Sequence, residues 1–214
     1  MKYRLTDNTT TLYETELYQI QACQDIPAYN VHKGDLGGYI EDDDCLSQVL
    51  DAWVKGNAHV FKGAIIAGNA HVYGNAVILN DARVYGNAVI SGDAQIFGLA
   101  QVYGSAQIGS GATIRGNAKI HGDIQIFTQA DICGKADIEM FNNYLTVSPM
   151  GSWRGYATFF RTSSKEIYAI SDRIEGDIKT FEDLIYNKYR YNIHGNAYRA
   201  AIAMAKEIIG KGGY

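Results

Sequence analysis

A branched aliphatic residue recurs every six positions through the middle of this chain. Fifteen successive positions at this spacing, from Val54 to Ile138, are valine or isoleucine without exception. Four residues after each of the first fourteen stands alanine, from Ala58 to Ala136, with Ile124 as the exception. Neither an amphipathic helix nor an alternating strand has a period of six. The repeat therefore predicts a solenoid in which each coil rests on its neighbours.

The period suits a triangular coil in which three short strands are joined by tight corners. The valine or isoleucine would fill the interior of the triangular prism, and the small alanine would let the wall come close to that interior. Glycine stands between these two inward positions at ten corners, which are Gly56, Gly68, Gly74, Gly86, Gly92, Gly98, Gly104, Gly116, Gly122 and Gly134. Glycine tolerates the positive φ that a sharp corner demands. The β-branched side chains favour extended backbone between the corners.

This repeat resembles the left-handed parallel β-helix of the hexapeptide-repeat family, of which VYGNAV at residues 72–77 is a typical unit. The resemblance implies a left-handed coil, an exception to the right-handed crossover rule. We predict a mainly β protein with the β-helix at residues 54–140. An N-terminal hairpin and capping coil would occupy residues 1–53, and a small C-terminal ββαα unit residues 141–214. The caps are needed because both ends of a β-helix expose strand edges.

The N-terminal segment predicts a hairpin with strands at residues 2–5 and 12–22 and a polar turn at residues 6–10. Ile40, Leu46 and Leu50 would form an irregular first coil. The loop before this coil contains the segment KGDLGGYIE at residues 33–41. We expect the loop to cap the prism. The alternative is a ligand loop made from Lys33, Gly34 and Gly37, for which a glycine-rich loop alone is a weak signal.

The C-terminal segment alternates like a pair of strands at residues 156–161 and 166–170. Thr180, followed three residues later by Asp183, suits the start of a helix that runs to about Tyr189. A second helix fits residues 197–209 and would end at Gly210. Such a unit is too small for a good core of its own, so we expect it to dock on the prism.

The order of these parts resembles that of proteins encoded by bacteriophages and prophages. The resemblance covers nearly the whole chain and is carried by the KGDLGGYIE segment, the repeats and the ββαα tail. The repeats are specific for fold and poorly specific for function. Other phage proteins with this prism capture nucleotide-derived bacterial immune signals. The resemblance therefore implies nucleotide binding by an anti-defence sponge as one role.

Charge is divided unevenly along the chain. Residues 1–150 carry 9 basic and 16 acidic side chains, whereas residues 151–214 carry 10 basic and 7 acidic ones. The β-helix has no basic stripe, so bulk nucleic acid is not an expected partner. A small anionic ligand near the basic C-terminal part is compatible with this distribution.

Cysteine spacing and hydropathy bear on the compartment. Cys23, Cys45 and Cys133 have the spacing of neither a zinc site nor a disulfide framework. No stretch has the length and apolarity of a membrane span, so no membrane partner is expected. These features predict a cytoplasmic protein, and the resemblance to phage proteins implies that this is the cytosol of a bacterial host.

An acyltransferase that uses acetyl-CoA is the first alternative function, because the best-known hexapeptide-repeat proteins have this activity. Such enzymes need a histidine as general base. His71 and His121 are the best candidates for that role here. The repeat runs without an inserted acceptor loop and carries few basic residues for the phosphates of CoA, and both facts count against this reading.

Carbonic anhydrases of the same fold hold zinc with three histidines. In this chain His59 and His71 are twelve residues apart and so fall on different walls of the prism, and His121 occupies another repeat position. The ligands do not converge, so we expect neither a metal site nor another cofactor.

Outward-facing side chains predict a covered surface. One wall would stack Phe61, Leu79 and Phe97, and another would stack Tyr85 and Tyr103 with His121. Exposed apolar ladders on a soluble prism imply a partner surface. Because the family usually forms threefold homotrimers, we expect the chain to associate with itself as a homotrimer whose clefts are lined by two subunits.

The C-terminal part is rich in groups that suit nucleotides, since aromatic rings stack on bases and arginine forks clamp phosphates. The expected ligand-binding residues are Trp153, Arg154, Arg161, Tyr189, Arg190, Tyr191, His194 and Arg199. The alternative is that the tyrosines pack against the prism. The predicted function is non-catalytic sequestration of a small anionic ligand, with no catalytic residues. A structural virion protein is the second alternative.

Overall fold

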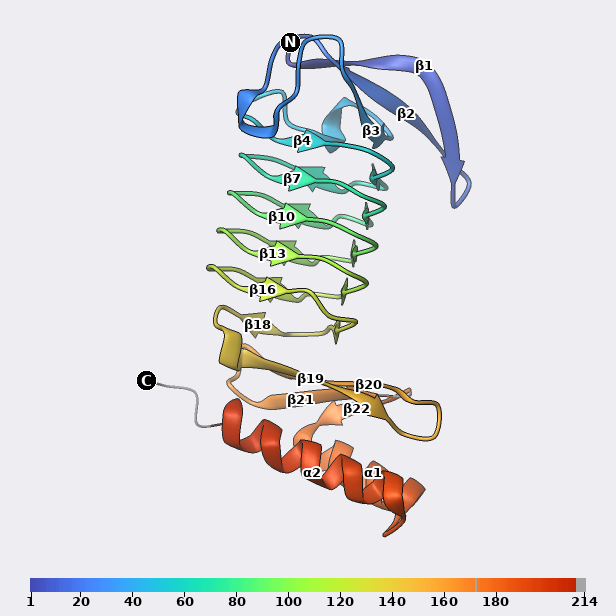
Figure 1. The fold of residues 1–214 in the computed structure, drawn as a ribbon, viewed down its shortest axis with the longest axis vertical. Coiled ribbons are helices and arrows are strands. Elements are labelled where there is room, and N and C mark those ends of the chain that lie inside the picture. Colours follow the sequence, from blue (N-terminus) through green and yellow to red (C-terminus); the bar gives the residue numbers. More distant parts are fainter. Residues whose placement is uncertain (172, 211–214) are drawn as a thin grey trace.

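The computed structural model describes residues 1–171 and 173–210, and it arranges them as three parts along one long axis (Figure 1). A hairpin lies at one end, a parallel β-helix of about six coils forms the middle, and a sheet with two helices lies at the other end. The mainly β fold, the β-helix, the hairpin and the C-terminal strands and helices that the sequence predicts are therefore confirmed.

The three walls of the prism are parallel sheets, and the first wall continues directly into the hairpin. Its strands, in the order in which they pair, are β1 (Tyr3–Leu12), β2 (Thr15–Ala22), β3 (Leu36–Ile40), β5 (His59–Phe61), β8 (Val77–Leu79), β11 (Gln95–Phe97), β14 (Thr113–Ile114) and β17 (Asp131–Ile132). The second wall contains β4 (Trp53–Val54), β7 (His71–Val72), β10 (Val89–Ile90), β13 (Gln107–Ile108) and β16 (Gln125–Ile126). The third contains β6 (Ile65–Ile66), β9 (Arg83–Val84), β12 (Gln101–Val102), β15 (Lys119–Ile120) and β18 (Asp137–Ile138).

The inward positions of the repeat are closed to solvent. Each valine and isoleucine of the six-residue series from Val54 to Ile138 is fully buried, and so are the alanines that follow them. Val72 pairs in register with Val54 on one side and Ile90 on the other, so like residues stack along the prism. Each buried aliphatic side chain contributes roughly 1.5–3 kcal/mol relative to an exposed one. The sum of these contacts holds the coils together.

The backbone conformation and close packing at the corners explain why glycine recurs there. Gly86 has a φ of 72°, and a Cβ added to it would lie 2.9 Å from the backbone nitrogen of Gly104 in the next coil. A side chain there would be strained and would push the coils apart. Beside this corner the side chain of Asn69 donates to Asn87 Oδ1 at 3.1 Å, which links neighbouring coils through their polar residues.

The N-terminal residues seal the open end of the first coil. Lys2 is buried, and its Nζ donates to the carbonyl oxygens of Ala52 at 2.7 Å and Leu50 at 3.2 Å. The hydroxyl of Tyr3 donates to the carbonyl oxygen of Leu46 at 2.6 Å. Burial lowers the pKa of Lys2 to about 8. These bonds satisfy carbonyl groups that the end of a solenoid would otherwise leave unpaired.

The glycines of the KGDLGGYIE segment serve packing. A Cβ on Gly37 would lie 2.6 Å from the carbonyl oxygen of Val54, and one on Gly38 would lie 2.7 Å from that of Ala58. The backbone of β3 therefore approaches the next coil more closely than any side chain allows. This contact fits the capping role expected of the loop.

The hairpin turn differs from the prediction. β1 runs through residues 6–10, where a turn was expected, and its ladder with β2 is irregular between Leu5 and Thr9. The chain reverses instead at Tyr13 and Glu14, whose φ values of 47° and 65° are typical of a type I′ turn. A polar run is compatible with a strand here because much of β1 is exposed on both faces.

The first coil also differs from the prediction, at one residue. Ile40 and Leu46 are buried as predicted, but Leu50 is exposed. The cause is the spacing, because Leu46 and Val54 are eight residues apart instead of six. The two additional residues push this corner outward and carry Leu50 into solvent.

The C-terminal unit is an antiparallel sheet covered by two helices. Its strands pair in the order β19 (Tyr144–Met150), β20 (Gly155–Arg161), β21 (Ile167–Ser171) and β22 (Ile174–Asp177), and the helices are α1 (Ile178–Tyr189) and α2 (Ile193–Ile208). The two predicted strands correspond to β20 and β21. β19 and β22 are additional, and β19 contains Pro149. Short 3₁₀ turns lie at Pro27–Tyr29, Asp43–Cys45 and Phe141–Asn143.

The C-terminal sheet is a shared layer between the prism and the helices (Figure 1). Phe160 and Ile170 pack into the prism core, whereas Phe159 and Ala169 pack against the helices. This alternation follows from the two-residue period of a strand. The unit thus closes the base of the prism, and the predicted docking is confirmed.

Candidate functional site

A cleft lies where the last coils of the prism meet the C-terminal sheet, and we call it the junction cleft. It encloses about 280 Å³ and is lined by His121, Asp137, Glu139, Met140, Asn143, Arg161, Thr162, Ser163 and Lys165. The backbone of the turn between β20 and β21 is fixed to the last coil, because Ala136 forms a bridge with Thr162 and the amide of Ser163 donates to the carbonyl oxygen of Lys135 at 2.9 Å. The prism side and the sheet side of the cleft are thus held at a fixed position relative to each other.

The prism side of the cleft presents His121 in a fixed orientation. Its ring stacks on Tyr103 with centroids 4.9 Å apart and planes 5° from parallel. Its Nε2 lies 2.9 Å from Asp137 Oδ1. When Nε2 donates its proton to this carboxylate, Nδ1 is left as a proton acceptor. The arrangement therefore makes the imidazole available both for stacking and for receiving a proton.

The opposite side of the cleft presents cations and hydroxyl groups on the β20–β21 turn. The turn is braced internally, because the amide of Lys165 donates to the carbonyl oxygen of Thr162 at 2.8 Å and Ser164 Oγ donates to Glu166 Oε2 at 3.0 Å. In the part of the chain that the structure describes, the Lys165 ammonium and the Ser163 hydroxyl form no hydrogen bond or ion pair. Arg161 is half-buried at the start of the same turn.

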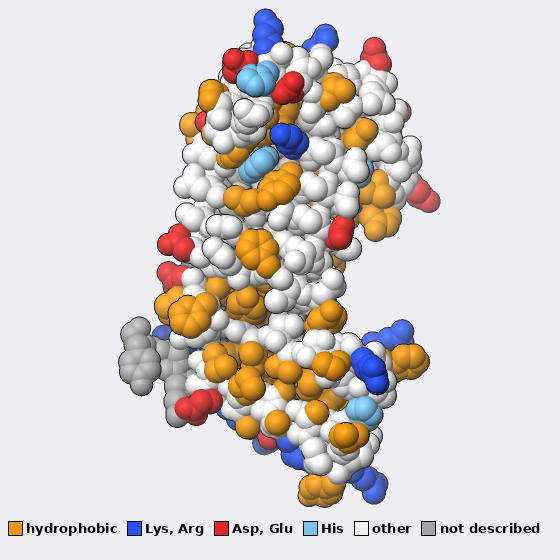
Figure 2. All heavy atoms as spheres, viewed as in Figure 1, with side chains coloured by type: hydrophobic (Ala, Val, Ile, Leu, Met, Phe, Trp, Pro, Cys, Tyr) orange, Lys and Arg blue, Asp and Glu red, His pale blue; other side chains and the backbone are white. Residues whose placement is uncertain are grey.

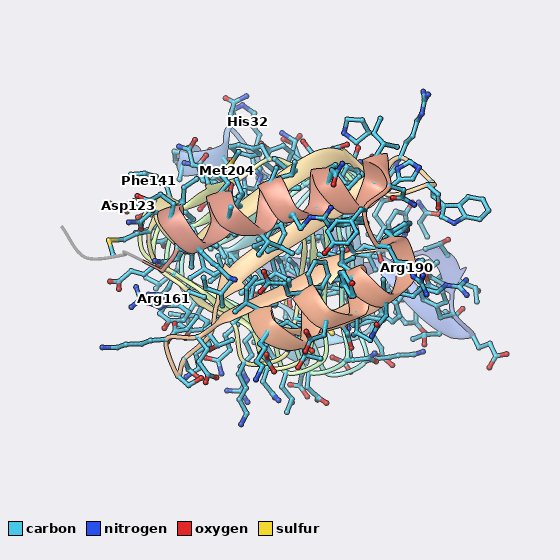
Figure 3. The ribbon with its side chains drawn as sticks, turned by 90° about the horizontal axis from the view of Figure 1, so that it is seen from below. His32, Asp123, Phe141, Arg161, Arg190 and Met204 are labelled. Carbon is cyan, nitrogen blue, oxygen red and sulfur yellow. The ribbon has the colours of Figure 1, made fainter. Side chains whose placement is uncertain are left out.

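A second cavity adjoins the junction cleft. It encloses about 540 Å³ and shares Glu139 and Met140 with the cleft, and its further lining residues are Gly122, Asp123, Ile124, Gln125 and Phe141. Asp123, Phe141 and Arg161 all lie toward one side of the molecule in Figure 3. Space for a ligand therefore continues beyond the cleft itself.

The structure separates the ligand-binding residues predicted from the sequence into three places. Arg161 lies in the junction cleft, and Arg190 lies at the opposite end of the C-terminal unit (Figure 3). Trp153 and Arg154 are exposed on the turn between β19 and β20. Around the turn between α1 and α2 lie Tyr189, Arg190, Tyr191, His194 and Arg199.

The residues at the helix turn are occupied with one another. The guanidinium of Arg199 lies 4.9 Å over the ring of Tyr191, and its Nη1 donates to the carbonyl oxygen of Arg190 at 2.8 Å. Tyr189 is buried, and its ring stacks on Tyr198 at 5.5 Å. Tyr189 thus packs in the core between the C-terminal sheet and the helices, and not against the prism as the packing alternative expects, whereas Tyr191 is exposed.

His71, the other candidate base, lies under the N-terminal segment. Tyr29 stacks on its ring with centroids 4.2 Å apart, and the ring of Tyr73 lies 4.9 Å away at a tilt of 37°. Burial lowers the pKa of His71 to about 4, and Lys55 adds to the effect. Its Nε2 has no hydrogen-bond partner among the described residues. Of the two histidines, His121 is the one that lines the junction cleft.

Sequence reasoning did not select Asp137, Ser163 or Lys165. Asp137 follows His121 by sixteen residues, which places it in the next coil, two positions before the residue in register with His121. The repeat register could have identified this pair. Ser163 and Lys165 carried no comparable signal, because they belong to a turn outside the repeat.

Neither a metal-binding cluster nor a membrane-spanning helix occurs in the described part of the chain. Among residues 1–171 and 173–210, no group of three or more His, Cys, Asp or Glu side chains is arranged to hold a metal ion. No helix within the described chain has the length and apolarity needed to span a membrane.

Comparison with models of known protein families gave no match to this chain, and comparison with curated proteins gave none. The residues of the junction cleft are therefore the basis for assigning a function.

Proposed function

We propose that this protein binds a small anionic ligand in the junction cleft and holds it without chemical conversion. The observation that carries this proposal is the concave site in which Arg161, Lys165 and Ser163 face His121. Arginine forks, ammonium groups and hydroxyls are the side chains that bind phosphate and carboxylate groups most strongly. The carboxylates of Asp137 and Glu139 favour a ligand that also carries hydrogen-bond donors.

A nucleotide-derived immune signal of the bacterial host is the first candidate ligand. A nucleotide combines anionic phosphates with hydroxyl and amino donors, which matches both sides of the cleft. The resemblance to phage-encoded prism proteins that capture such signals supports this choice. In that role the protein would act in the host cytosol as an anti-defence sponge.

We further propose that three copies of the chain associate side by side. On the third wall, Ile65, Ala67, Arg83, Val84, Tyr85 and Gln101 line a largely apolar groove of about 390 Å³. Hydrophobic side chains form separate patches on the face that carries β4, β7, β10, β13 and β16 (Figure 2). On the first wall, Leu79 and Phe97 pair in register and point outward. Apolar surface of this kind is stabilised when a partner covers it.

Binding is tested with variants at the two ends of the C-terminal unit. Arg161→Ala and Lys165→Ala should each weaken the binding of a nucleoside phosphate about tenfold or more, because each removes a charge-assisted hydrogen bond of about 1.5–3 kcal/mol. Arg190→Ala is the matched control, since it removes an arginine from the same unit far from the cleft. Isothermal titration calorimetry measures the affinities.

The opposite result would show that the ligand binds elsewhere in the C-terminal unit. Weaker binding in Arg190→Ala, with unchanged affinity in Arg161→Ala and Lys165→Ala, would place the ligand at the α1–α2 turn. Mass spectrometry of small molecules released from the denatured protein identifies a captured ligand directly. A chemically altered product would argue against capture without conversion.

Acyl transfer is the second candidate function, and the His121–Asp137 pair favours it. His121 Nδ1 could take a proton from an attacking hydroxyl or amine, while Asp137 stabilises the imidazolium that forms. Release of free CoA from acetyl-CoA in the presence of an acceptor would support this activity. His121→Ala should then abolish turnover. A structural virion protein would show neither binding nor turnover and would assemble beyond the trimer.

A further inference from the structure

An aromatic column on the third wall ends at the junction cleft. The rings of Tyr85, Tyr103 and His121 stack in succession with centroids 4.9 Å apart at each step and planes within 5° of parallel. This spacing matches the distance between neighbouring strands of a sheet. One coil beyond His121, the same column position is occupied by Glu139, which has no ring. The column therefore stops at His121.

The surroundings of His121 leave one ring face toward the cleft. Tyr103 covers the other face, and Asp137 occupies the Nε2 edge. The side chain is nevertheless 20 % exposed and lines the cavity. The accessible part of the imidazole therefore comprises the face turned away from Tyr103 and the Nδ1 edge.

We propose that the ligand of the junction cleft carries a planar heteroaromatic ring that stacks on His121, together with an anionic group bound by Arg161 and Lys165. The ring would lie over the face of His121 that is turned away from Tyr103, beside the side chain of Glu139. This inference rests on the proposed function and adds the ligand class, a mononucleotide-like anion.

The dimensions and charges of the site agree with this class. The volume of about 280 Å³ is near the lower limit of small-molecule pockets, about 300 Å³. The adjoining cavity provides further room past Glu139 and Met140. The carboxylates of Asp137 and Glu139 can accept hydrogen bonds from ring amino groups or sugar hydroxyls. Aromatic stacking and phosphate binding are thus available within one continuous space.

Three probes separate the ring from the anion: adenosine 5′-monophosphate, ribose 5-phosphate and inorganic phosphate. With the whole chain, titration calorimetry should show adenosine 5′-monophosphate binding about tenfold more tightly than ribose 5-phosphate, because one stacked base contributes a factor of this order. His121→Ala should remove the preference. His121→Phe should retain it, since the ring remains while the bond to Asp137 is lost.

His59→Ala is the matched control, because it removes a histidine ring that also stacks on a tyrosine, Tyr39, but lies at the N-terminal end of the prism, far from the cleft. Its preference for adenosine 5′-monophosphate should equal that of the unmodified protein. Thermal melting of each variant verifies that the prism is folded. A tenfold preference that survives in folded His121→Ala would overturn the proposal.

Failure of the ring proposal differs from failure of anion capture. Equal affinity for adenosine 5′-monophosphate and ribose 5-phosphate, with both weakened in Arg161→Ala, would reject the stacked ring and leave the anion site intact. Absence of binding for all three probes at millimolar concentration would reject the anion site and the ring together.

Discussion

Three histidines on the prism walls differ in their surroundings, and their chemistry differs accordingly. Burial lowers the pKa of His59 and His71, whose rings stack against Tyr39 and Tyr29. His121 stacks on a tyrosine as well but is hydrogen-bonded to a carboxylate. A neutral, covered imidazole stabilises the N-terminal cap, whereas the imidazole beside the cleft is placed to meet a ligand.

The pKa of His71 makes the stability of the cap dependent on pH. It is about 4 in the folded protein and about 6.5 in the unfolded chain. Between these values the unfolded chain binds more protons, so the free energy of unfolding falls as the pH falls from about 6.5 toward 4. Above about pH 6.5 the contribution is complete.

The variant His71→Phe should reduce this dependence, because phenylalanine keeps a ring in contact with Tyr29 and Tyr73 but does not titrate. Thermal denaturation at pH 7.5 and pH 5.0 measures the effect. The drop in Tm between the two pH values should be smaller in the variant than in the unmodified protein. Identical drops would show that His71 is not the group that titrates.

Among the elements, the N-terminal hairpin is attached to the first wall at its tip. Tyr13 stacks on Phe61 with centroids 6.2 Å apart, and Lys62 Nζ donates to the carbonyl oxygen of Tyr13 at 3.4 Å. Phe61 is fully buried, whereas Leu79 and Phe97, which follow it in the same ladder, are partly exposed. The hairpin therefore covers the first rung of the apolar ladder.

Tyr13→Ala should loosen the hairpin without unfolding the prism. Loss of the ring pair removes about 0.5–1.5 kcal/mol from this contact. Hydrogen exchange of amides in residues 3–22 should accelerate, and exchange in residues 54–138 should stay unchanged. Glu14→Ala is the control, because it alters the other residue of the turn and leaves the stack in place. Faster exchange throughout the prism would contradict a local attachment.

The sequence predicts the existence of the hairpin but misplaces its turn. Residues 6–10 lack apolar side chains and so resemble a loop, although β1 tolerates polar residues because much of it is solvent-exposed. The true turn uses Tyr13 and Glu14, which are unusual at positive φ. Tyr13 is held there by its contact with Phe61, and a contact across 48 residues is not visible in local propensity.

For the whole molecule, the outward ladder on the first wall bears on assembly. Leu79 and Phe97 are paired in register and point away from the core. If the chain forms the proposed trimer through its apolar ladders, Leu79→Glu combined with Phe97→Glu should convert it to a monomer, because a buried carboxylate without a partner is strongly unfavourable.

Light scattering after size-exclusion chromatography measures this change as a threefold loss of mass. Ser152→Glu is the control, since it adds a charge at an exposed polar position on the turn between β19 and β20, outside the three walls of the prism. A mass that is unchanged by the double substitution would exclude this wall from the interface.

The hexapeptide spacing alone was enough to predict the prism, its core and its glycine corners. The physical reason is that each coil repeats the same local demands, namely a buried branched side chain, a small wall residue and a corner at positive φ. The same spacing also predicts the stack of Tyr85, Tyr103 and His121. Periodicity relates any residue of the repeat to its neighbours one coil away.

The junction cleft depended on tertiary packing. His121 and Asp137 belong to the repeat, but Arg161, Ser163 and Lys165 belong to an aperiodic unit whose sheet docks through Phe160 and Ile170 on the base of the prism. The side chains that meet there are determined by burial of this apolar face and by the Ala136–Thr162 bridge. No spacing in the sequence spans that boundary, because the repeat ends where the docked sheet begins.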